Sequence, residues 1–317
     1  MVRQRVFYGS ILLIGLVVLM IADAWLSRPA QGAQCPLRAV LGFGGLTAFG
    51  FALVVLGGAV ELCRICRQAG YQPALAWSLL MVVLFMVAPW LSSPHGWVAL
   101  SQAGTRFTAL SQIEGILPWI ALLGTALILV ARQRTNGAIG AFGTGLLVVF
   151  YLGGLSSYCV RLRCWWPGPE GAWLTLAILF IIKVTDIGAY FTGIALGKTP
   201  LIPRVSPKKT WEGLIGGVAA AAAVSYAAMG WLLPVYGGCA ALRVLSIPQV
   251  IVFGIVMAVI GQAGDLVESL FKRDGGVKDS AHLVPTFGGV LDVIDSPILA
   301  VPVAYWLLRW WLSCFPS

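Results

Sequence analysis

Long apolar runs dominate the pattern of hydrophobic and polar positions along the 317-residue chain. A helix that crosses the roughly 30 Å hydrocarbon core of a bilayer needs about 20 mostly apolar residues. A transmembrane β-barrel would show short segments of alternating polarity instead. The pattern therefore predicts an all-α polytopic membrane protein with about nine transmembrane helices, near residues 8–26, 39–61, 73–91, 116–131, 137–155, 172–196, 212–234, 248–271 and 294–314.

The loops between these runs set the expected orientation. With the N-terminus inside, thirteen basic residues face the cytosol and seven face the opposite side. Positive residues favour the cytosolic side of a membrane, so we expect an N-in/C-out topology. The short 116–131 run is expected to form a tight hairpin with the 137–155 run around Arg132 and Arg134.

Composition and charge exclude several classes of protein. Apolar residues make up 59% of the chain and charged residues 10%, against about 25% charged residues in a soluble domain. A soluble enzyme, a disordered chain and a secreted disulfide scaffold are therefore excluded. The net charge of +9 lies in short loops without a basic stripe and interleaved aromatics, so no nucleic-acid partner is expected.

The seven cysteines indicate little chemistry. Cys63 and Cys66 form a C-x-x-C without a second pair or a histidine nearby, so a zinc site is not expected. An extracytoplasmic disulfide stays open among the four cysteines that the topology places outside, which are Cys35, Cys159, Cys164 and Cys239.

Ionisable residues divide the chain into two halves. Eight of the twelve acidic residues fall between Asp186 and Asp295, and the six lysines fall between Lys183 and Lys278. Charged groups in or beside a bilayer are costly, which favours a functional role for them. We therefore expect a hydrophobic helical half over residues 1–155 and a catalytic half over residues 172–317.

The first charged segment lies within an apolar helix. Asp186 at this depth needs a cation or a hydrogen-bond donor, and Lys183 is one helical turn away, so a structural ion pair is an alternative to a ligand site. Gly188, Ala189 and Gly193 are small enough to pack closely around a ligand.

The second charged segment, Ser206-Pro-Lys-Lys-Thr210, leads into a predicted helix. Free backbone N–H groups and the helix dipole favour an anion such as a phosphate at a helix N-terminus, where a hydroxyl and two ammonium groups would add donors. A loop that only sets topology would explain Lys208 and Lys209 but not Glu212 beside them.

The third charged segment runs from Gly261 to Ser296. Asp265, Glu268 and Lys272 recur on one helical face, and Asp292 and Asp295 open the last apolar run one turn apart. Hard cations such as Mg²⁺ take oxygen ligands and share them with substrate phosphates. Two acidic pairs from different helices therefore predict a divalent-metal and polyphosphate site, since a solvated loop would not place carboxylates within apolar helices.

These motifs resemble a known family. The pattern S-x-x-K-R-x(4)-K-D from Ser269 to Asp279, followed by P-x-x-G-G-x-x-D-x-x-D from Pro285 to Asp295, is similar to the signature of phosphatidate cytidylyltransferases, or CDP-diacylglycerol synthases. The Asp186 and Ser206 segments also look like this family's, in the expected order, so the resemblance covers roughly residues 172–317. The chain departs from the family pattern at three positions, which are Ile194, Phe287 and Val293, where the family commonly has Arg, His and Arg.

The resemblance implies that phosphatidate attacks the α-phosphate of CTP to give CDP-diacylglycerol and pyrophosphate, with Mg²⁺ required and K⁺ as a further candidate cofactor. It implies a multi-pass protein of the cell inner membrane with its charged loops in the cytosol, where CTP is found, and a homodimer. The expected metal ligands are Asp265, Asp292, Glu268 and Asp295. The expected catalytic set is Asp265, Asp292, Lys272, Arg273 and Asp279, and the expected substrate-binding set is Ser206, Lys208, Lys209, Thr210, Lys278 and Asp186.

The sequence admits four alternative functions. An ion-coupled transporter would show an internal repeat, and none is evident in the sequence. Another CTP-dependent lipid enzyme, of the CDP-archaeol synthase or polyprenol kinase type, fits the full motif pattern less well. A CDP-alcohol phosphatidyltransferase would carry a D-G-x-x-A-R motif, which is missing. An inactive paralogue is suggested by Phe287 and Val293.

Overall fold

The computed structural model describes residues 2–28, 41–93, 112–133, 135–166, 168–277 and 289–313, with side chains from Ile14 onward. Packing divides the chain into two compact units. Unit 1 comprises Met1–Ala172 and Phe271–Ile294, and unit 2 comprises Trp173–Leu270 and Asp295–Ser317. The two units are defined by the packing contacts within the chain. The predicted halves 1–155 and 172–317 are a division by function and stay a prediction.

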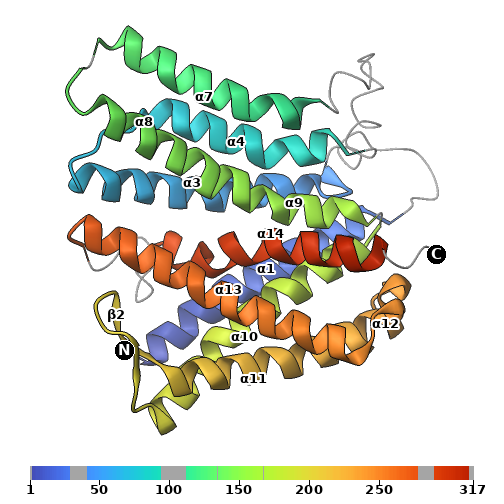
Figure 1. The fold of residues 1–317 in the computed structure, drawn as a ribbon. Helices are drawn as coiled ribbons and strands as arrows, with labels where there is room; N and C mark the ends of the chain where they lie inside the picture. Colours follow the sequence, from blue (N-terminus) through green and yellow to red (C-terminus); the bar gives the residue numbers. More distant parts are fainter. Residues whose placement is uncertain are drawn as a thin grey trace, which may run out of the picture. The chain divides into compact units, whose positions relative to one another are not determined.

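Most of the helices of unit 1 run alongside one another (Figure 1). Its helices are α1 (Val2–Leu26), α3 (Gly45–Gln68), α4 (Leu75–Leu91), α7 (Ile113–Ala131) and one long helix made of α8 (Ala138–Leu147), the π-helical turns η1 (Val148–Gly154) and α9 (Leu155–Trp165). The predicted hairpin is confirmed, because α7 ends at Ala131, α8 begins at Ala138 and the two helices are in contact. Arg132 follows α7 as its C-cap, and Arg134 lies outside the described residues.

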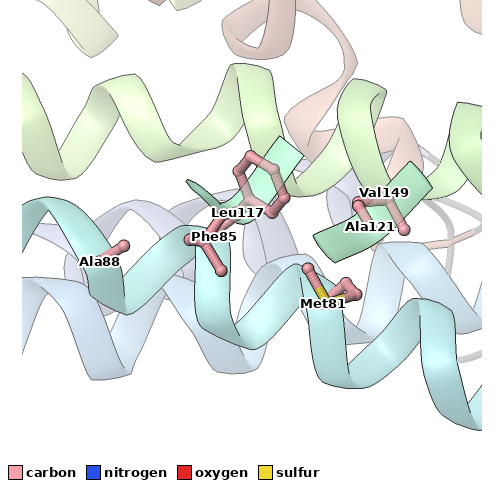
Figure 2. Packing of buried hydrophobic residues seen from close by; sticks show 6 residues of the cluster. All are labelled: Met81, Phe85, Ala88, Leu117, Ala121 and Val149. Atoms are coloured by element: carbon pink, nitrogen blue, oxygen red, sulfur yellow. The ribbon is translucent and has the colours of Figure 1, made fainter. Parts of the chain in front are cut away.

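The core of unit 1 surrounds α4. Met81, Phe85 and Ala88 on one face of α4 pack against α7 and η1 (Figure 2). A Cβ at Gly153 would lie 3.0 Å from Val82 Cα, so the glycine lets the π-helical turns approach the α4 backbone. Lipid is as apolar as these side chains, so close van der Waals packing, rather than transfer out of water, holds these helices together.

Unit 2 contains the remaining helices and a small hairpin of two strands. They are α10 (Glu170–Leu196, from Trp173), β1 (Pro200–Ile202), β2 (Ser206–Thr210), α11 (Trp211–Ala227), the π-helical turn η2 (Ala228–Leu232), α12 (Leu233–Val235), the 3₁₀ turn η3 (Ala240–Val244), α13 (Ile247–Asp274, to Leu270) and α14 (Leu291–Ser313, from Asp295). Strands β1 and β2 pair antiparallel, with Pro200 opposite Thr210 and Ile202 opposite Ser206.

Small residues set the helix spacing in unit 2. A Cβ at Gly188 of α10 would lie 2.8 Å from Ala220 Cβ of α11, and one at Gly217 would lie 3.2 Å from Ala189 Cβ. Gly193 likewise faces the start of α11. The interpretation of Gly188, Ala189 and Gly193 as room for a ligand is therefore wrong, because these residues pack helix against helix, as small residues do inside membranes.

Among the described residues, seven helices are long and apolar enough to cross a bilayer, so the chain is a helical membrane protein. They are Gly45–Gln68, Ile113–Ala131, Ala138–Trp165, Glu170–Leu196, Trp211–Val235, Ile247–Asp274 and Leu291–Ser313. The other two predicted spans coincide with shorter apolar helices, Ile14–Leu26 and Leu75–Leu91. The count of nine and the N-in/C-out orientation stay predictions.

Candidate active site

Three carboxylates of unit 2 lie together where α13 and α14 meet. Asp265, Glu268 and Asp295 each offer an oxygen, and these atoms all lie within 4.8 Å of one another. Glu268 and Asp295 are buried, and Asp265 is half-buried. A Cβ at Gly264 would lie 2.5 Å from the Asp295 carbonyl oxygen, so this glycine permits the close approach that brings the three carboxylates together.

Two lysines from separate elements reach this carboxylate cluster. Lys209 of β2 places its Nζ 2.6 Å from Asp265 Oδ2. Lys183 of α10 places its Nζ 3.4 Å from Asp186 Oδ2 and 3.8 Å from Asp295 Oδ1. The predicted Lys183–Asp186 ion pair is thus present, and Lys183 also links Asp186 to the three carboxylates.

Gln262 was not predicted as part of this site. Its Nε2 donates a hydrogen bond to Asp186 Oδ1 at 3.0 Å, which ties α13 to α10. Gln262 lies three residues before Asp265, on the same helical face, and is itself buried. The sequence signal that could have identified Gln262 is a polar residue one turn before a carboxylate in an apolar helix.

In the part of the chain that the structure describes, acidic side chains outnumber basic ones in the contacts of this cluster. These contacts join four carboxylates (Asp186, Asp265, Glu268 and Asp295) and only two ammonium groups (Lys183 and Lys209). Negative charge in excess within membrane-spanning helices is costly unless a cation offsets it. Oxygen donors from carboxylates are what Mg²⁺ prefers, so Asp265, Glu268 and Asp295 fit this ion as ligands.

The hairpin of β1 and β2 presents the basic segment. Side chains alternate along a strand, so Lys208 and Lys209 of β2 point to opposite sides; Lys209 reaches Asp265 and Lys208 is exposed. Thr210 is the N-cap of α11, because its Oγ1 accepts a hydrogen bond from the Gly213 N–H at 3.1 Å. Ser206 opens the strand and is half-buried. The predicted place of this segment at a helix N-terminus is confirmed.

Glu212 closes the base of the hairpin. Its carboxylate accepts hydrogen bonds from the Lys198 and Thr199 N–H groups, both at 3.2 Å, and from Thr199 Oγ1 at 2.9 Å. Glu212 therefore orders the hairpin that carries Lys208 and Lys209. A loop that only sets topology would not need this residue.

Unit 1 holds the rest of the predicted set. Lys272, near the end of α13, forms an ion pair with Asp292 of α14. Asp292 also accepts a hydrogen bond from the Gly289 N–H at 2.7 Å. Asp292 belongs to unit 1 and the three clustered carboxylates belong to unit 2, so its role as a metal ligand stays a prediction.

Two further positions of the motif, Arg273 and Val293, lie near helix ends. Arg273 is exposed in the last turn of α13, and Val293 lies in the first turns of α14. Lys278, Asp279, His282 and Phe287 lie outside the described residues. Among the described cysteines, Cys63, Cys66, Cys159 and Cys164 are free thiols, Cys239 Sγ donates a hydrogen bond to the Gly237 carbonyl oxygen at 3.7 Å, and Cys35 lies outside the description.

Comparison with known proteins agrees with the motifs. The model of the cytidylyltransferase family matches residues 35–311. A phosphatidate cytidylyltransferase of Haemophilus influenzae is 31% identical over 81% of this chain and 88% of the relative. Those of Brucella suis (35% identical over 70% of this chain and 82% of the relative) and Pseudomonas aeruginosa (39% identical over 63% and 73%) are also similar. The resemblance carried by the motifs is confirmed, and the chain belongs to the cytidylyltransferase family.

Proposed function

We propose that this protein is a phosphatidate cytidylyltransferase, which converts CTP and phosphatidate into CDP-diacylglycerol and pyrophosphate in phospholipid synthesis. The agreement between the ordered motifs and the relatives that carry this name supports it most directly. The alternatives, another CTP-dependent lipid enzyme or an ion-coupled transporter, are not favoured by these relatives.

The reaction needs positioning and charge neutralisation more than covalent chemistry from the protein. A phosphate oxygen of phosphatidate forms a bond to the α-phosphorus of CTP, and the bond from that phosphorus to the oxygen bridging to the β-phosphate breaks. Pyrophosphate leaves with the electron pair. Holding both substrates in line lowers the entropic part of the barrier, and cations that face the phosphates offset the charge that develops.

The residues divide into those that hold an ion and those that hold phosphates. We assign Asp265, Glu268 and Asp295 as ligands of Mg²⁺, with Asp292 as a further candidate and K⁺ as an additional cofactor. Mg²⁺, when bound, neutralises phosphate charge. The basic residues assigned to the phosphates of CTP and phosphatidate are Lys208, Lys209, Lys272, Arg273 and Lys278.

The other polar residues position these groups. Asp186 pairs with Lys183, which also lies beside Asp295, and accepts a hydrogen bond from Gln262. Ser206 offers a hydroxyl on the strand that carries the lysines. Thr210, expected to contact substrate, serves first as the cap of α11. Asp279 is retained as a catalytic candidate on the motif alone, and residues 172–317 are proposed as the catalytic half.

Topology and assembly complete the proposal. Nine helices, with the N-terminus inside and the C-terminus outside in a cell inner membrane, would place the β1–β2 hairpin in the cytosol with CTP. Alkaline phosphatase fused at the C-terminus would then be active and a fusion after Leu196 inactive; the reverse pattern would contradict this orientation. A homodimer is proposed from the resemblance alone, and the mass of the purified protein in detergent tests it.

The proposed function is tested with a panel of lipid acceptors. Purified protein is incubated with radiolabelled CTP, Mg²⁺ and either phosphatidate, an archaeal-type lipid phosphate or a polyprenol, and the lipid products are separated by chromatography. We expect labelled CDP-diacylglycerol from phosphatidate. The assignment would be contradicted if product formed from the archaeal-type lipid phosphate or the polyprenol but not from phosphatidate, or if none of the three acceptors gave product.

A further inference from the structure

Glu61 is a buried carboxylate in the hydrophobic half of the chain that no motif includes. It lies on α3 and its side chain is fully buried. Its Oε1 accepts the Val290 N–H at 2.9 Å and its Oε2 accepts the Leu291 N–H at 2.8 Å. Both carboxylate oxygens are therefore engaged by backbone donors that lie about 230 residues away along the chain.

These donors belong to the start of α14, which begins at Leu291. The first N–H groups of a helix have no partner within the helix, and the helix dipole favours a negative charge there. A buried carboxylate in turn needs strong donors to offset the loss of hydration. Glu61 thus supplies the acceptor and negative charge that the helix start lacks, and the N–H groups supply the donors that the buried carboxylate needs. This contact therefore fixes where α14 begins.

Two glycines of α3 leave room for residues 290–294 to pack closely against this helix. A Cβ at Gly57 would lie 3.2 Å from Val290 Cγ2, and a Cβ at Gly58 would lie 2.9 Å from Ile294 Cδ1. Residues 57, 58 and 61 of α3 therefore receive residues 290–294 by packing as well as by hydrogen bonds. The packing is independent of the hydrogen bonds and places the same turn at the same position.

This turn carries Asp292 of the family motif. The Gly289 N–H is bound by Asp292 itself, the next two N–H groups are bound by Glu61, and Asp292 forms its ion pair with Lys272. We propose that Glu61 is a positioning residue for the reaction: it clamps the Gly289–Leu291 turn and thereby fixes the orientation of Asp292 toward Lys272. The effect on turnover rests on the proposed function, whereas the clamp itself does not.

The test compares Glu61→Gln with native protein and with Glu114→Gln as a matched control. Glutamine has nearly the same volume, but its NH₂ group faces an N–H donor and its charge is gone. Glu114 is the other acidic residue of α3, α4 and α7 and pairs with Arg161. Hydrogen exchange is followed in peptides that cover residues 289–296 and, as an internal reference, 117–129.

We expect Glu61→Gln to speed exchange at least about tenfold in the 289–296 peptide, with the reference peptide unchanged. Turnover per folded molecule should fall about tenfold to a hundredfold, since small misplacements cost this much, while the KM for CTP stays within about threefold. Glu114→Gln should leave both readouts at native values. If Glu61→Gln fails to fold, Glu61→Asp, which keeps the charge one methylene shorter, should show the same local exchange with a smaller loss of turnover.

Native exchange in the 289–296 peptide of both Glu61 variants would overturn the clamp, as would acceleration spread equally over the reference peptide. Local exchange with native turnover would overturn the positioning role. If the native protein itself forms no CDP-diacylglycerol, the proposed function fails, and the exchange comparison still decides the clamp.

Discussion

The two units treat buried acids differently. In unit 1, Asp23 of α1 pairs with Arg163 of α9, both fully buried, and Arg163 Nη2 also donates to Ser27 Oγ at 2.6 Å. In unit 2, Lys183 pairs with Asp186 and Asp295, Lys209 pairs with Asp265, and the Glu268 carboxylate lies beside those of Asp265 and Asp295.

This difference indicates a structural role for the buried pair of unit 1 and a chemical role for the carboxylate cluster of unit 2. An acid matched one to one by a guanidinium is neutral as a pair and needs nothing further, although removing one partner leaves a costly buried charge. Within the described ranges of unit 2, three carboxylates with oxygens within 4.8 Å of one another instead offer the oxygen donors of a cation site, which we propose binds Mg²⁺. Substitutions in the Asp23–Arg163 pair should therefore change stability, and substitutions in the carboxylate cluster of unit 2 should change turnover.

The largest effect is expected for Arg163→Met. It leaves Asp23 buried without its cation, which should lower the free energy of unfolding by about 3–5 kcal/mol. Thermal unfolding in detergent measures the loss, and turnover per folded molecule should stay native. The control is Arg161→Met, whose pair with Glu114 is 29% and 20% exposed and should contribute less than about 1 kcal/mol. Equal losses from both variants would contradict the comparison.

Next comes Lys209→Met in unit 2. Loss of this ammonium beside Asp265 removes a cation at the proposed phosphate site, so turnover should fall about 10²-fold. The melting temperature should change little, because the Asp265 carboxylate that loses its partner is 30% exposed. Steady-state kinetics at saturating Mg²⁺ provide the readout. Lys208→Met, on the other side of the same strand, should mainly raise the KM for CTP; indistinguishable kinetics for the two variants would contradict the assigned roles.

The smallest effect is expected for Glu212→Gln. The variant weakens the hydrogen bonds to Lys198 and Thr199 at the hairpin base without touching the carboxylate cluster. A loss of about 1 kcal/mol would raise the KM for CTP about fivefold and leave kcat near native. Glu170→Gln, at the first turn of α10, is the matched control and should be silent. A large fall in kcat would show that Glu212 does more than order the hairpin.

Much of the fold could be predicted from the apolar pattern alone. Each predicted run coincides with a helix because a chain in lipid satisfies its backbone hydrogen bonds within the helix. The i, i+3 spacing of Asp265 and Glu268 likewise predicted a shared face, which the cluster with Asp295 confirms.

The tertiary partners could not be predicted in this way. Spacing cannot tell that Lys272 pairs with Asp292, nor that Gly188 serves the packing of α10 against α11. The contact of Glu61 with Leu291 spans 230 positions, so no local pattern contains it. Such partners depend on how separate helices pack, and this information is spread over the whole chain.

The most direct test of the account is the Mg²⁺ dependence of CDP-diacylglycerol formation by native protein, Asp265→Asn and Glu114→Gln. The account predicts that native activity requires Mg²⁺ and that Asp265→Asn lowers maximal turnover about 10²-fold and raises the Mg²⁺ concentration for half-maximal activity. Glu114→Gln should match the native response. If Asp265→Asn kept native turnover and a native Mg²⁺ response, this result would contradict the claim that the carboxylate cluster of unit 2 binds Mg²⁺.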